Sequence, residues 1–108
     1  MSDVENRENT AEEARIPLPP ASFEFLIFSL RAQADMQLGL MHFGEGEKPK
    51  PDLGLARHTI DMLAVLQQKT KGNLSLEEQR MLENSLTELR FRFVQVTEES
   101  QQADSQKA

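Results

Sequence analysis

The chain has 108 residues, no cysteine and a formal net charge of −6. This length fits one domain, and without cysteine the chain can form no disulfide, no thiolate metal site and no cysteine nucleophile, which favours a reducing, cytoplasmic location. The excess acid lies toward the two ends, and the near-neutral middle offers no basic stripe for a phosphate backbone, so we expect no nucleic-acid partner.

Both ends of the chain are predicted to be disordered tails. Residues 1–21 carry five acids against two bases and include the proline-rich segment 16–20, whose backbone is expected to be extended. Residues 97–108 carry three acids against one base. The first residues lack the basic and apolar parts of a secretion signal, and the most apolar window, residues 23–41, holds three charged residues and is not expected to cross a membrane. The helical domain is therefore predicted to span residues 22–96.

The first helix is predicted over residues 23–41 with Ser22 as its N-cap, and it carries apolar residues on two opposite sides. The first side consists of Phe23, Ile27, Leu30, Ala34, Leu38 and Met41. The second consists of Phe25, Phe28, Ala32, Met36 and Gly39. The polar strips between them are Glu24, Arg31 and Asp35 on one flank, and Ser29, Gln33 and Gln37 on the other.

A surface helix needs only one apolar face, so the second face of this helix requires an explanation. Either the helix is sandwiched between two other helices of its own chain, or its second face contacts another subunit. We favour the subunit contact, because only two further helices are available to cover it.

The second helix is predicted over residues 53–70, after a polar connector at residues 44–51. The paired glycines of the connector follow no strand, so we do not interpret them as a phosphate-binding loop. Asp52 is the expected N-cap. The helix is predicted to bury a broad apolar arc of Leu53, Leu55, Ala56, Ile60, Met62, Leu63, Ala64 and Leu66.

The third helix is predicted over residues 75–96, after a short turn in which Gly72 takes a left-handed conformation and Ser75 with Glu78 forms a capping box. Its apolar residues form a narrow seam that needs a partner helix: Leu82, Leu86, Leu89, Phe93 and Val96. Phe91 lies off this seam. The short turn predicts an antiparallel hairpin of the second and third helices, so the fold class is all-α with three helices.

Several short segments carry a family resemblance: residues 23–30, 38–39, 59–61, KTKGNL at 69–74 and ELRFRFV at 88–94. Together they resemble a bacterial family of short proteins described as domain of unknown function 1844. The resemblance covers about residues 22–96, and its most distinctive part is the helix stop at 69–74. It implies a bacterial, cytoplasmic, helical protein, and it brings no known activity, cofactor or catalytic residue.

No pattern in the sequence indicates catalysis, so we predict no enzyme activity, no catalytic residue and no cofactor. His58 and Asp61 lie three residues apart on one helical surface, and His42 approaches them if the first two helices are antiparallel. Two histidines and a carboxylate are a minimal set of metal ligands, but an exposed polar face explains them equally well, and we predict no metal site.

The leading hypothesis is a small helical interaction or structural module that self-associates through its first helix. The expected contacts with a second copy or another protein are Phe25, Phe28, Ala32 and Met36. Peripheral membrane association through the same face is disfavoured, because interfacial helices usually carry a polar face rich in Lys and Arg. A metal-binding protein based on His and Asp is the third hypothesis.

Overall fold

The computed structural model describes residues 17–107 except 42–43, 45 and 47–48. It contains three α-helices, α2 (Phe23–Gln37), α3 (Leu53–Lys69) and α4 (Leu76–Lys107), and no strand occurs within the described residues. The prediction of an all-α fold with three helices is therefore confirmed. The predictions made for residues 1–16 lie outside the described residues.

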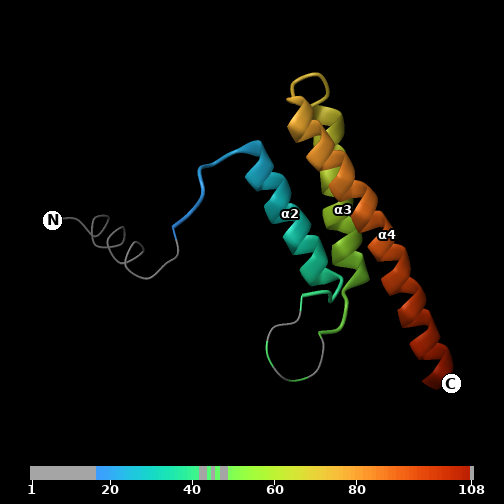
Figure 1. Cartoon of the computed structure of the whole chain (residues 1–108). Helices are drawn as coiled ribbons and strands as arrows, with labels where there is room; N and C mark the ends of the chain where they lie inside the picture. Colours follow the sequence, from blue (N-terminus) through green and yellow to red (C-terminus); the bar gives the residue numbers. More distant parts are fainter. Residues whose placement is uncertain (1–16, 42–43, 45, 47–48, 108) are drawn as a thin grey trace.

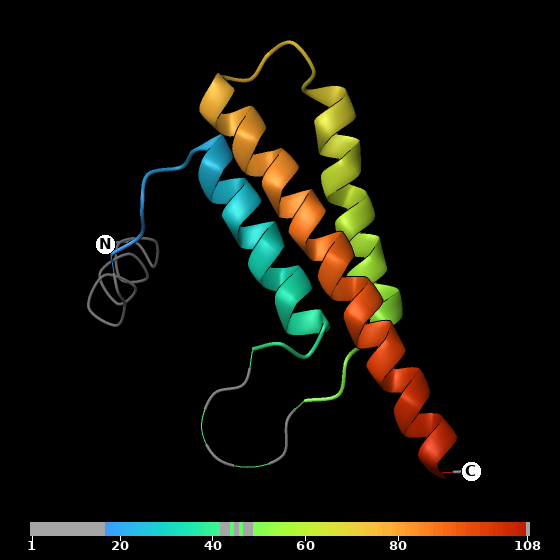
Figure 2. The ribbon, with the colours of Figure 1, turned by 45° about the vertical axis from the view of Figure 1, so that its right-hand side comes forward.

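The three helices pack against one another around one core. Figures 1 and 2 show that the chain reverses direction between α3 and α4, which lie side by side, and that α2 lies alongside the pair. Every helix contributes to the core, whose buried apolar members are Ile27, Ala34, Leu38, Ala56, Ile60, Leu63, Leu82, Leu86, Leu89 and Val96. The seam predicted for the third helix is buried, because four of its residues are core members and Phe93 packs against them.

The three predicted helix starts are confirmed. At each of them a side chain accepts a hydrogen bond from a backbone N–H group that has no partner within the helix. Ser22 and Asp52 each accept a hydrogen bond from the third residue of the helix that they begin, at 3.0 and 3.1 Å. Ser75 and Glu78 form the predicted capping box, in which each side chain accepts the other's backbone N–H, at 3.1 and 2.8 Å. Gly72 has the predicted positive φ, at 85°.

Helix α2 ends at Gln37, so the prediction that it continues to residue 41 is wrong. Gly39 has a φ of 76°, and its N–H donates to the carbonyl of Met36 while the N–H of Leu40 donates to that of Asp35. This pair of bonds is the Schellman motif, which closes a helix at a left-handed residue. Gly39 therefore ends the helix and does not belong to its second apolar face.

Helix α4 continues to Lys107, so the prediction that residues 97–108 are disordered is wrong for residues 97–107. This stretch contains no Gly or Pro, and seven of its eleven residues are Glu, Gln, Ala or Lys, which have high helix propensity. Extending an existing helix avoids the unfavourable nucleation step. The side chains of residues 101–105 are all exposed, so propensity rather than packing accounts for this extension, which projects beyond the other two helices in Figure 2.

Helix α3 buries a narrower arc than the sequence predicted. Its buried residues are Ala56, Thr59, Ile60 and Leu63, whereas Leu55 and Met62 are exposed. A helix in a three-helix bundle is covered only where its two neighbours contact it, and apolar residues beyond that arc remain at the surface.

Replacing Gly39 by Ala should lower the free energy of unfolding by about 1–2 kcal/mol, because an L residue is disfavoured in the left-handed region. A Cβ at this position would also lie 2.8 Å from the carbonyl oxygen of Pro49. Gly54→Ala is the matched control, since its Cβ would have only Asp52 Oδ1 nearby, at 3.7 Å. It should raise stability by roughly 0.4–1 kcal/mol. Urea unfolding of both variants measures the difference, and an equal effect of the two changes would contradict the role of Gly39.

Candidate functional site

One face of α2 is turned into the core. Ile27, Ala34 and Leu38 are buried, and Phe23 and Leu30 pack partly against the same cluster. These residues all belong to the first of the two apolar sides predicted from the sequence. The orientation of α2 in the bundle is set by this side together with the polar strips beside it.

The charged strip of α2 faces α4. Arg31 donates a hydrogen bond to the carboxylate of Glu88, and Arg92 Nη1 donates to Asp35 Oδ1 at 2.9 Å. Both pairs join residues 57 positions apart in the chain, so α2 and α4 run in the same direction with a defined register. Arg31 Nε also lies 3.9 Å from Asp35 Oδ2, which links the two pairs into one network.

The amide strip of α2 faces α3, where Thr59 is only 3% exposed. The Thr59 hydroxyl donates to Gln37 Oε1 at 2.6 Å and accepts a hydrogen bond from Gln33 Nε2 at 3.4 Å. A buried hydroxyl without partners would be costly, and these bonds remove that cost. The two polar strips are thus both used inside the chain, one by each neighbouring helix.

The second apolar side of α2 points away from the bundle. Phe25, Phe28 and Met36 are 37%, 58% and 59% exposed, and Ala32 between them is half-buried. The rings of Phe25 and Phe28 stack, with their centroids 6.3 Å apart and their planes at 22°. We call these four residues the outer patch. It contains the four residues that sequence analysis selected as contacts, without Gly39.

A second exposed apolar region lies on α4. Phe91 is 64% exposed, and Val94 beside it borders a shallow hollow of about 200 Å³. The hollow is lined by Arg57, Ile60, Asp61, Arg90, Phe93 and Val94. Val94 lies on a different side of α4 from Glu88 and Arg92, which bind α2, whereas Phe91, three residues from Glu88, lies between the two sides. This region belongs to another helix than the outer patch.

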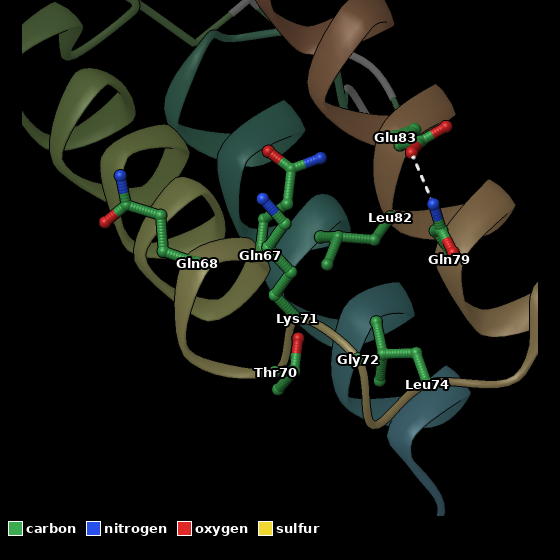
Figure 3. Close-up of a pocket in the computed structure, with 9 residues that line it drawn as sticks. All are labelled: Gln67, Gln68, Thr70, Lys71, Gly72, Leu74, Gln79, Leu82 and Glu83. Atoms are coloured by element: carbon green, nitrogen blue, oxygen red, sulfur yellow. Dashed lines mark hydrogen bonds between the residues drawn. The ribbon is translucent and has the colours of Figure 1, made fainter.

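A further hollow of about 280 Å³ lies at the turn between α3 and α4 (Figure 3). Leu74 and Leu82 supply its apolar part, and Gln79 donates a hydrogen bond to Glu83 at 3.1 Å. Thr70 supplies the only hydroxyl of the lining, and it donates to the carbonyl of Leu66 at 2.6 Å. The lining contains no histidine and no pairing of a nucleophile with a base, so we assign no reaction to it.

The residues of the metal hypothesis are only partly described. His58 and Asp61 lie on the exposed side of α3, and His42 lies outside the described residues. Within the described ranges, no three His, Cys, Asp or Glu side chains are grouped so that they could hold a metal ion. Because His42 lies outside the described residues, the structure does not test whether these three residues come together.

Three residues that position the site were not selected from the sequence. Thr59, Glu88 and Arg92 hold the flanks of α2, but each has the ordinary pattern of a polar residue on a helix surface. Their partners lie 22 to 57 residues away in the chain, and no local spacing rule connects such pairs.

The model of a protein family described as Domain of unknown function (DUF1844) matches residues 20–95. The match includes all of α2 and α3 and most of α4, and therefore the outer patch and both flanks. Comparisons with curated proteins and with solved structures give no match.

Replacing Thr59 by Val should lower the free energy of unfolding by roughly 0.5–1.5 kcal/mol, because Gln37 and Gln33 lose their bonds to the buried hydroxyl. Thr87→Val is the matched control, since Thr87 is exposed on α4 and the same change there removes no bond between helices. Urea unfolding compares the two. A loss at Thr59 no larger than that at Thr87 would contradict the role of this hydroxyl.

Proposed function

The chain belongs to the family described as Domain of unknown function (DUF1844), and we propose that it is a small helical interaction module that self-associates through the outer patch of α2. The exposure of the outer patch is the observation that carries this proposal. Its three large apolar side chains lie on a helix whose core side is buried and whose two polar strips are bonded to α4 and α3.

Single exposed apolar residues are normal on protein surfaces, but the outer patch is a group. Its members recur at Phe25, Phe28, Ala32 and Met36, a spacing that keeps them on one side of the helix. No charged residue interrupts this side. Aromatic residues and Met are enriched at protein interfaces, and contiguous apolar surface of this kind marks interaction sites.

The outer patch is also held in a fixed geometry. The pairs Arg31–Glu88 and Asp35–Arg92 hold one flank of α2, and the bonds of Thr59 hold the other. A surface that is already ordered loses little conformational entropy on binding, so more of the burial energy remains for association. Self-association would also add apolar burial to a folded part that is small for one core.

Membrane binding through the outer patch is the competing hypothesis. Interfacial helices surround their apolar face with Lys and Arg, whereas the flank of α2 carries Glu24 and Asp35 with a single Arg31, which is already bonded to Glu88. No helix in the described part of the chain is both long and apolar enough to span a bilayer. The charge around the patch therefore supports a protein partner.

The proposal assigns no catalytic role to the chain and places it in the cytoplasm. The cysteine-free sequence is compatible with this location, because the chain needs no disulfide and disulfides are rare in reducing compartments. Support for a binding role comes from the outer patch alone.

Phe28→Asp should give a folded monomer, because a charge within the outer patch opposes burial against a second copy. Light scattering across a dilution series measures the mass, and circular dichroism checks that the helices remain. Phe91→Asp is the matched control, since Phe91 is a similarly exposed aromatic residue on another helix, α4. It should leave the mass of the assembly unchanged.

Leu86→Asp provides the contrast to both surface changes, because Leu86 is buried in the core and a charge there should unfold the chain. An unmodified chain that is monomeric at every concentration would contradict the proposal. So would an assembly that Phe91→Asp dissociates and Phe28→Asp does not.

The full chain should not float with vesicles that contain an anionic lipid, because the flank of α2 offers no cluster of unpaired basic residues. Liposome flotation with and without the Phe28→Asp change measures this. If the unmodified chain floats with the vesicles and Phe28→Asp abolishes this flotation, the outer patch binds a membrane surface and not a protein partner.

A further inference from the structure

We infer that two copies of the chain pair through α2 in antiparallel directions, about a two-fold axis that passes beside Ala32. This inference rests on the proposed self-association and specifies its geometry. It is carried by the order of large and small side chains in the outer patch and by the charge at one end of α2.

Three of the four members of the outer patch, Phe28, Ala32 and Met36, are evenly spaced about Ala32. Phe28 precedes Ala32 by four residues and Met36 follows it by four, so each lies about 6 Å from Ala32 along the helix axis. If two α2 helices cross at Ala32 in opposite directions, Phe28 of each copy meets Met36 of the other. A two-fold axis makes this contact twice, as expected for a surface that binds a copy of itself.

The sizes of the side chains favour the same arrangement. Ala32 is the smallest member of the outer patch, and at the axis it allows the two helices to approach closely. Phe28 then packs against the flexible thioether of Met36, a favourable contact between sulfur and an aromatic ring. A parallel pair would instead place the two bulky Phe28 rings together at one end and the two thioethers together at the other.

The ends of α2 also distinguish the two directions. Glu24 is the acidic residue of the first turn, and the last turn has no basic residue. A parallel pair would place the two Glu24 carboxylates beside each other. In an antiparallel pair they are about 24 Å apart along the axis, beyond the screening length at physiological salt. Phe25 then lies near the segment that follows the partner's α2, where Leu40 is exposed.

The absence of cysteine from the chain allows a direct test by single-cysteine crosslinking. The variants are Ala32→Cys, Phe28→Cys and Met36→Cys, with Phe91→Cys as the control on another surface. After mild oxidation, nonreducing gels measure the disulfide-linked dimer, and a mass tag on one variant identifies mixed dimers. Ala32→Cys should crosslink to itself, because a residue at the axis meets its own copy within disulfide reach.

The mixture of Phe28→Cys with Met36→Cys decides the direction. We expect several-fold more mixed dimer than dimer of either variant alone, and only collisional crosslinking for Phe91→Cys. If Phe28→Cys and Met36→Cys each crosslink to themselves and their mixture gives no additional mixed dimer, the two helices are parallel. That result would overturn the antiparallel inference but not the proposed self-association. An unmodified chain that dimerises while none of the three variants exceeds the control would place the interface elsewhere. A monomer at every concentration would overturn the proposed function itself.

Discussion

Two ion pairs one helical turn apart join α2 to α4, and a buried threonine hydroxyl joins α2 to α3. Burial of the apolar side holds α2 against the bundle, but hydrophobic attraction has no preferred direction and does not by itself define rotation or register. Hydrogen bonds do, because they require particular atoms at particular distances. Since the ion pairs are partly exposed, they contribute little stability, and their main effect is to orient the helix.

The same bonds decide which surface the molecule presents. With both polar strips bonded to neighbouring helices, the remaining side of α2 has to face outward, and that side is the outer patch. Stability and the proposed binding role therefore depend on opposite sides of one helix. The core side holds Ile27, Ala34 and Leu38, and the outer side holds Phe28 and Met36. Changes on the outer side can alter association without removing core contacts.

Local sequence signals were sufficient for the helix starts and for the seam of α4. A cap such as Asp52, or the reciprocal bonds of Ser75 and Glu78, involves residues within one turn, so spacing alone predicts it. Helix ends were harder, since Gly39 fits an apolar pattern as well as a left-handed stop. Leu55 and Met62 were predicted to be buried but are exposed, because the sequence does not show how much of a helix its neighbours cover.

The sequence by itself determined that the chain forms three helices, that α2 has two apolar sides, and that these sides are separated by polar strips. These properties depend on the 3.6-residue period and on neighbouring side chains, which the order of residues contains directly. Only the tertiary structure decided which side of α2 enters the core and which remains exposed. That choice depends on Thr59, Glu88 and Arg92, which come within bonding distance of α2 only when the three helices pack together.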